Sequence, residues 1–167
     1  NPDDLTLEKL DALRRSPINR LSIGVQSFHE TDLTFFNRAH NAAEARQCIA
    51  LARAAGFRDL TVDLIYGSPT MPDEQWAANL NTLFEAEIPH FSAYALTVEP
   101  QTALDYFVKK GKVPPVVEEK AAHHFDMLVE MATAAGYEQY EVSNFAKPGR
   151  YAVHNSSYWK GAAYLGI

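Results

Sequence analysis

Hydrophobic and polar residues follow two alternating patterns along the first hundred residues. Over residues 41–56, apolar side chains recur three and four positions apart, which is typical of a helix with one buried side. Residues 60–66 are almost all apolar, as in a strand that is buried on both faces of a parallel sheet. Residues 21–26 alternate large apolar with small or polar side chains, which indicates a strand with two unlike faces. Strands and helices alternating at this spacing predict right-handed βαβ crossovers and an α/β fold with a parallel sheet.

Capping signals set the ends of the expected elements. Asn41 with Glu44 forms a capping box, and Gly56 suits the left-handed conformation that follows many helices. Thr6 and Asp73 are expected to cap two further helices. The sequence after residue 142 is expected to be rich in loops. The predicted helices cover residues 7–15, 42–55, 74–88, 104–110 and 117–135, and the predicted strands cover 21–26, 60–66, 91–96 and 140–142.

Composition narrows the class of protein. The chain has 167 residues, of which 47% are hydrophobic, so it is long enough for one packed core. Its net charge is −6 with no basic stripe, so nucleic acid is not expected as a partner. No apolar run of about 18 residues and no secretory leader occur, so we expect no transmembrane segment and a cytoplasmic location. The chain starts without an initiator Met, which we interpret as a piece of a longer protein.

A single cysteine, Cys48, limits the metal chemistry. It cannot form an internal disulfide, and it cannot by itself hold a zinc ion or an iron–sulfur cluster, which need about four ligands. Any centre built on thiolates must therefore come from another part of the protein.

Polar residues near the predicted strand ends are candidates for ligand binding, because the loops there line the open mouth of a parallel α/β sheet. Gln26, Asp63 and Thr97 all lie near such ends. A carboxylate in an apolar strand costs several kcal/mol unless a partner compensates it, about 3–5 kcal/mol in measured cases. Asp63 therefore has two possible roles. It binds a hydroxyl or ammonium group of a ligand, or it is a structural residue that caps a neighbouring backbone group or pairs with an arginine.

Two further places carry candidate chemistry. Arg38 can grip a carboxylate through two parallel N–H bonds, although an arginine in such a segment is more often a solvated surface charge. His154 to Trp159 groups an imidazole, an amide and two large aromatic rings, which can ligate haem iron and stack on a flat ring. The alternative is a loop histidine beside aromatic residues that cover the sheet edge. The other histidines are expected to be structural or exposed.

Several short motifs together resemble one family, the HemN/HemW branch of radical S-adenosylmethionine (SAM) proteins. The similarity runs over nearly the whole chain, and its specificity lies in the order and spacing of the motifs. It implies a partial parallel (β/α) barrel, the later half of a radical SAM TIM-like barrel, over residues 1–100, followed over 101–167 by the start of a C-terminal α+β region. The motifs are Gly24-Val25-Gln26-Ser27-Phe28, Asn37-Arg38, Val62 to Gly67, Glu99 to Thr102, Gly136 to Glu141, Ser143 to Ala146 and His154 to Trp159.

The resemblance also implies residue roles. Gln26, Arg38 and Asp63 match positions that contact SAM in the family, and Thr97 matches a position that contacts the adenosine through its backbone. The His-Asn-x-x-Tyr-Trp pattern looks like a haem-binding motif of the haem chaperones, and it is not expected in coproporphyrinogen oxidases. His154 is then the candidate axial ligand of haem iron.

The resemblance leaves the activity open between two functions. The first is a haem chaperone that binds haem and SAM and passes haem to acceptor proteins. The second is an oxygen-independent coproporphyrinogen III oxidase, which binds a porphyrinogen and makes protoporphyrinogen IX. A third reading from the residues alone, a hydrolase with Asp63 as its base, lacks a nucleophile or metal partner for Asp63.

The family's three-cysteine loop, which holds a [4Fe–4S] cluster, has no counterpart in this sequence. We therefore expect the chain alone to perform no radical chemistry and to bind SAM weakly or not at all. The exposed edge of strand 21–26 is expected to allow edge-to-edge dimerisation.

Overall fold

A five-stranded mixed sheet forms the centre of the molecule, in the order β1-β2-β3-β5-β4. The computed structural model describes residues 1–163. The first three strands are parallel, as the sequence predicts, whereas β5 runs antiparallel to both β3 and β4. The strands are β1 (Arg20–Gln26), β2 (Asp59–Tyr66), β3 (His90–Ala95), β4 (Glu138–Gln139) and β5 (Asn144–Ala146).

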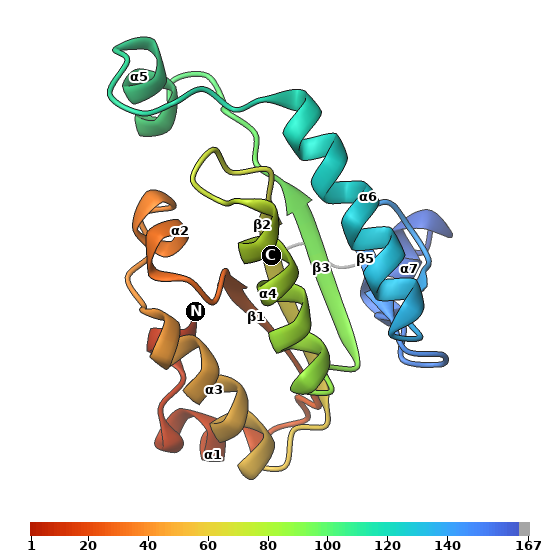
Figure 1. The fold of residues 1–167 in the computed structure, drawn as a ribbon. Coiled ribbons are helices and arrows are strands. Elements are labelled where there is room, and N and C mark those ends of the chain that lie inside the picture. The colour runs from red at the N-terminus through yellow and green to blue at the C-terminus, as the bar shows by residue number, and fades with distance from the viewer. Residues whose placement is uncertain (164–167) are drawn as a thin grey trace.

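Helices cover one face of this sheet. Helices α3, α4 and α6 lie across it side by side, and α5 extends away from the sheet (Figure 1). Helix α7 lies on the opposite side. The helices are α1 (Leu7–Arg14), α2 (Glu30–Phe35), α3 (Ala42–Ala54), α4 (Asp73–Glu85), α5 (Ala103–Lys109), α6 (Glu118–Ala134) and α7 (Val153–Trp159), preceded by a short 3-10 helix η1 (Pro2–Asp4).

Alternation along the strands separates the covered face from the other one. Val62 and Leu64 on β2 are fully buried against the helices, and Phe91 continues this core on β3. The opposite face carries the small and polar residues of the same strands, and we call it the open face. Thr61 is buried on this face, whereas Asp63 and Ile65 are only half-buried, so the expected burial of β2 on both faces holds only in part here. The open face carries Arg20 and Ser22 of β1, Thr61 and Asp63 of β2 and Ser92 of β3.

The best local prediction concerns α3. Asn41 accepts a hydrogen bond from the Glu44 backbone, and the Glu44 carboxylate accepts one from the Asn41 backbone, so the capping box is present. The apolar residues of its stripe, Ala45, Cys48, Ile49 and Ala52, are all buried. Gly56 has a φ of 92° just after the helix. Local capping and apolar spacing are therefore sufficient to define this element.

Three local predictions are wrong. Residues 140–142 form the connection between β4 and β5, because the ladder to β3 starts only at Asn144. Pro72 is the N-cap of α4, and the Asp73 carboxylate instead contacts His123 and His124 of α6. Residues 153–159 form helix α7, although the segment was expected to be loop-rich.

A buried polar network fixes the segment after β1. The Asp32 carboxylate is fully buried and accepts hydrogen bonds from Ser27 at 2.8 Å, Thr70 at 3.1 Å and Gln75 at 2.7 Å. Asn79 of α4 accepts a further bond from the Phe28 backbone at 2.7 Å. These bonds join the loops after β1 and β2, so the strand ends that carry the candidate site are held together.

Within residues 1–163, no helix combines the length and the apolar character that crossing a membrane requires.

Candidate functional site

Asp63 lies at the centre of the open face, between polar side chains of the two neighbouring strands. It is in register with Gly24 of β1 and with Ser92 of β3. Ser22 Oγ donates to Asp63 Oδ2 at 3.2 Å, and the Ser92 hydroxyl, which bonds Asn144 Oδ1 at 2.8 Å, also interacts with the carboxylate. Burial raises the pKa of the Asp63 carboxyl, and the hydrogen bonds from Ser92 and Ser22 oppose this shift. No arginine or lysine of residues 1–163 forms an ion pair with Asp63, so the carboxylate retains unused acceptor capacity.

Three of the predicted site residues line one depression of about 350 Å³, which we call the strand-end hollow. Gln26 comes from the end of β1, Asp63 from β2 and Thr97 from the segment after β3. Ile65 and residues 94–96 complete its wall. The carboxyl ends of three adjacent parallel strands thus converge on the same space, as expected for a ligand site in a parallel α/β fold.

Gln26 and Arg38 meet above Gly24. Gln26 adopts a left-handed φ of 68° where the β1–β2 register shifts, a conformation that is uncommon for a residue other than glycine. A Cβ atom at Gly24 would lie 2.7 Å from Gln26 Nε2 and 3.6 Å from Arg38 Nη2. Arg38 Nη2 donates to Asn1 Oδ1 at 2.6 Å and to the Gly24 carbonyl at 3.3 Å. Arg38 is therefore beside the strand-end hollow rather than part of its lining.

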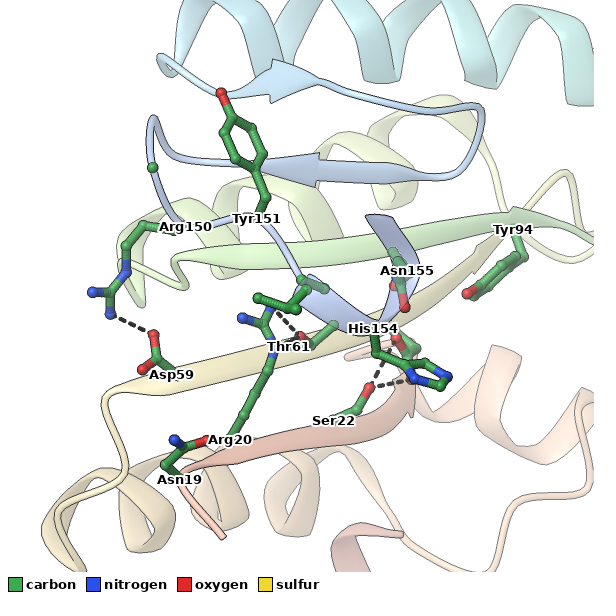
Figure 2. A pocket seen from close by; sticks show the side chains of 15 residues that line it. Asn19, Arg20, Ser22, Asp59, Thr61, Tyr94, Arg150, Tyr151, His154 and Asn155 are labelled. Carbon is green, nitrogen blue, oxygen red and sulfur yellow. Dashed lines mark hydrogen bonds and ion pairs between the residues drawn. The ribbon is translucent and has the colours of Figure 1, made fainter. Parts of the chain in front are cut away.

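A larger depression of about 600 Å³ lies between the open face and α7, and we call it the α7 hollow (Figure 2). Figure 2 shows Arg20 and Ser22 on the sheet, with His154 and Asn155 on α7. His154 is exposed, and its ring makes an edge contact with the Tyr158 ring at a centroid distance of 4.9 Å. Asp63 and Tyr94 line both hollows, so the two are adjacent on the same side of the sheet.

Sequence reasoning missed three polar residues of the open face: Ser22, Ser92 and Arg20. The two serines flank Asp63, and Arg20 donates to Thr61 Oγ1 through Nε at 3.2 Å and Nη2 at 2.9 Å. The alternation along each strand was a usable signal, because it places these polar residues on one face of the sheet. Which of them become neighbours depends on the strand register. The register itself is not readable from one strand at a time.

Comparison with known proteins shows which proteins this chain is similar to. The model of the radical SAM superfamily matches residues 1–83. Over these residues the chain is similar to the radical SAM superfamily. Three curated relatives span its full length: the haem chaperone HemW of Bacillus subtilis at 36% identity, HemW of Escherichia coli at 38%, and the mitochondrial radical SAM domain-containing protein 1 of Mus musculus at 36%. The chain spans 44%, 43% and 38% of the length of these relatives, respectively.

A solved structure supports the same similarity. The coproporphyrinogen III oxidase HemN of Escherichia coli superposes with a TM-score of 0.77 at 26% identity, over 96% of this chain and 36% of that one. The archaeal Elp3 of Methanocaldococcus infernus superposes with a TM-score of 0.65 at 21% identity, which shows similarity of fold alone. The predicted partial barrel with parallel strands is therefore confirmed.

Radical SAM proteins use SAM together with an iron–sulfur cluster, and the side chains of this chain fit SAM better than they fit the cluster. The polar row around Asp63 offers acceptors to ribose hydroxyl and ammonium groups. Cys48, in contrast, is a buried residue of α3; its thiol donates to the Ala45 carbonyl, and burial raises its pKa to about 11. Residues 1–163 contain no group of three or more His, Cys, Asp or Glu side chains placed to hold a metal ion.

Proposed function

We propose that this chain is part of a HemW-type haem chaperone of the radical SAM superfamily, which binds SAM at the strand-end hollow and haem at His154. The observation that supports it best is the convergence of Gln26, Asp63 and Thr97 on one hollow at the ends of adjacent parallel strands. The two HemW relatives, each similar to the whole of this chain, favour the same function.

The SAM part of the proposal assigns a role to each residue by its chemistry. The Asp63 carboxylate accepts hydrogen bonds from hydroxyl or ammonium groups, and the Gln26 amide both donates and accepts. Arg38 exchanges its bond to Asn1 for the SAM carboxylate, which is a stronger acceptor for a guanidinium. Thr97 contributes a backbone contact to the adenosine. When bound, SAM and the cluster of the longer protein supply one-electron chemistry that amino-acid side chains lack.

The haem part of the proposal rests on α7. His154 is exposed at the α7 hollow, so its imidazole is accessible to a metal. Tyr158 and Trp159 lie in the same helix and are 54% and 69% exposed, which leaves aromatic surface for a flat ring. Acceptor proteins for the haem are proposed as partners, because a chaperone must release what it carries.

Haem titration of the full-length protein tests this function. His154→Ala is expected to shift the Soret band and to weaken haem binding at least tenfold, because an axial ligand is lost. His123→Ala is the matched control, since His123 is an exposed helical histidine outside both hollows. An unchanged spectrum and affinity in His154→Ala would show that this histidine does not ligate haem.

A second candidate is oxygen-independent coproporphyrinogen III oxidase. It is supported by the superposition on HemN of Escherichia coli, although the identity of 26% is lower than the 36–38% to the HemW proteins. Anaerobic incubation of the reconstituted full-length protein with coproporphyrinogen III distinguishes the two. Formation of protoporphyrinogen IX would favour the oxidase, and its absence together with haem binding would favour the chaperone.

We also propose that residues 1–100 are the later βα units of the barrel and that 101–167 begin the C-terminal region, of which 164–167 lie outside the described residues. A cytoplasmic location is proposed for the protein. The chain taken alone is proposed to lack radical chemistry and to form dimers through β1, which is an edge strand of the sheet. Sedimentation of the isolated chain tests the last point, because a purely monomeric chain would contradict it.

A further inference from the structure

Arg20 is a cation without an anionic partner on the floor of the α7 hollow. It lies at the start of β1 and is half-buried. Both of its bonded groups, Nε and Nη2, donate to one neutral oxygen, Thr61 Oγ1. No carboxylate of residues 1–163 forms an ion pair with it, because the neighbouring Asp59 pairs with Arg150 at 2.8 Å. A guanidinium has five N–H donors, so Arg20 retains donors for a further acceptor.

The side chains nearest to Arg20 compensate its charge only in part. His90 faces it from β3, and burial, reinforced by the charge of Arg20, lowers the pKa of His90 to about 3, so this ring is neutral. The Tyr140 hydroxyl lies 2.6 Å from His90 Nε2 and is likewise uncharged at neutral pH, since burial raises its pKa. Burial is also the main cause that lowers the pKa of Arg20. The Asp59 carboxylate attracts Arg20 and opposes this shift, but it is ion-paired with Arg150, and the hydrogen-bonded partner of Arg20 is the neutral Thr61 hydroxyl. A partly desolvated cation is costly unless an anion compensates it, and a ligand can supply that anion.

We infer that Arg20 binds a carboxylate of the ligand that occupies the α7 hollow. The planar guanidinium matches a carboxylate through parallel N–H bonds, and bonds of this kind are about twice as strong as neutral ones. The inference rests on the proposed function, because His154 lines the same hollow and haem carries propionate carboxylates. Arg20 then anchors the periphery of the ring whose metal His154 ligates.

SAM is another source of a carboxylate, and its proposed site is at the other end of β1. Arg20 and Gln26 are six residues apart, which corresponds to about 20 Å along a strand. We therefore assign a haem propionate to Arg20. SAM is included in the test as an alternative source of the carboxylate.

The test compares haem, haem dimethyl ester and SAM as probes of the full-length protein. Arg20→Met is expected to weaken haem binding about tenfold, as the loss of a charge-assisted hydrogen-bonded pair predicts, and to leave binding of the ester unchanged. Arg20→Lys should retain part of the affinity, because it keeps the charge but loses the planar fork. Arg150→Met is the matched control: this arginine lines the same hollow but already has a carboxylate partner, so we expect a change of less than about threefold.

The possible outcomes separate this inference from the proposed function. Equal binding of haem by Arg20→Met and wild type, with a lost Soret shift in His154→Ala, would overturn the Arg20 site alone. Weaker haem binding in Arg20→Met, with no effect of His154→Ala, would support the carboxylate site and contradict the axial ligand. Equal losses for haem and its ester would overturn the inference, because the ester has no carboxylate. A loss confined to SAM would overturn the propionate assignment, and failure of the wild type to bind haem would contradict both proposals.

Discussion

The Ser22 hydroxyl donates a hydrogen bond to the Asp63 carboxylate at 3.2 Å across the gap between two parallel strands. Ser92 flanks the same carboxylate from the third strand, and no cation accompanies it among residues 1–163. The result is a half-buried carboxylate supported by hydroxyl groups only. Such a group lowers the stability of the folded chain at neutral pH. It also provides a hydrogen-bond acceptor that a ligand can use.

Asp63→Asn is expected to separate stability from SAM binding. Because the folded pKa of Asp63 is raised, its contribution to stability is present below its unfolded value of about 3.9 and is lost as pH rises through the folded value. The neutral amide removes this cost at pH 7, so the melting temperature should stay equal or rise by a few degrees, about 2–4 °C per kcal/mol. SAM affinity of the full-length protein should fall about tenfold or more. A lower melting temperature, measured calorimetrically, would contradict the account of Asp63.

Gly24→Ala is expected to disturb the site while leaving the fold intact. The added Cβ would lie 2.7 Å from Gln26 Nε2, which is the far end of a flexible side chain and can move. The free energy of unfolding should therefore change by less than about 1 kcal/mol, whereas SAM affinity should drop because the Gln26 amide is displaced. If Gly24→Ala binds SAM as well as the wild type does, Gln26 is not a SAM contact.

Acid is expected to destabilise the fold through His90. This ring is fully buried with a pKa of about 3, far below the unfolded value of about 6.5, so only the unfolded chain takes up the proton between these values. The stabilising contribution is complete above about pH 6.5 and falls by about 1.4 kcal/mol per pH unit below it, down to about pH 3. His124, whose pKa is also lowered mainly by burial, acts in the same direction.

Urea unfolding of the chain between pH 4 and 7 measures this effect. His90→Gln should flatten the acid slope by up to one proton, and His123→Gln, which replaces an exposed histidine, is the control. A slope that His90→Gln leaves unaltered would assign the acid sensitivity to other groups.

Gly67→Ala should destabilise the chain more than Gly111→Ala. Both glycines have a positive φ, 75° and 65°, so each substitution carries a backbone cost of about 1–2 kcal/mol. A Cβ at Gly67 would also lie 2.9 Å from Ala121 Cβ and 3.2 Å from its Cα, whereas nothing lies within 4 Å of a Cβ at Gly111. We expect the steric conflict to add about 1–3 kcal/mol for Gly67→Ala only. Equal losses in chemical denaturation would mean that α6 packs less tightly on the end of β2 than the structure indicates.

The sequence by itself determined the local elements and the positions of the candidate residues along them. The Asn41–Glu44 capping box, the apolar stripe of α3 and the polar residues at strand ends depend on neighbours within a few positions, so they are readable from one chain. The same holds for the parallel order of β1 to β3, because helices of this length between strands require crossover connections.

Only the tertiary structure decided how distant segments meet. Three features depend on strand register: the antiparallel pairing of β5 with β3, the row of Ser22, Asp63 and Ser92, and the bonds from Arg20 to Thr61. Helix α7, only seven residues long, is too short to be stable by propensity alone and depends on its contacts with the rest of the chain. Contacts between residues 40 or more positions apart leave no periodic pattern in the sequence. The sequence therefore indicated that the site lies at the strand ends, but the contacts between its residues were known only from the fold.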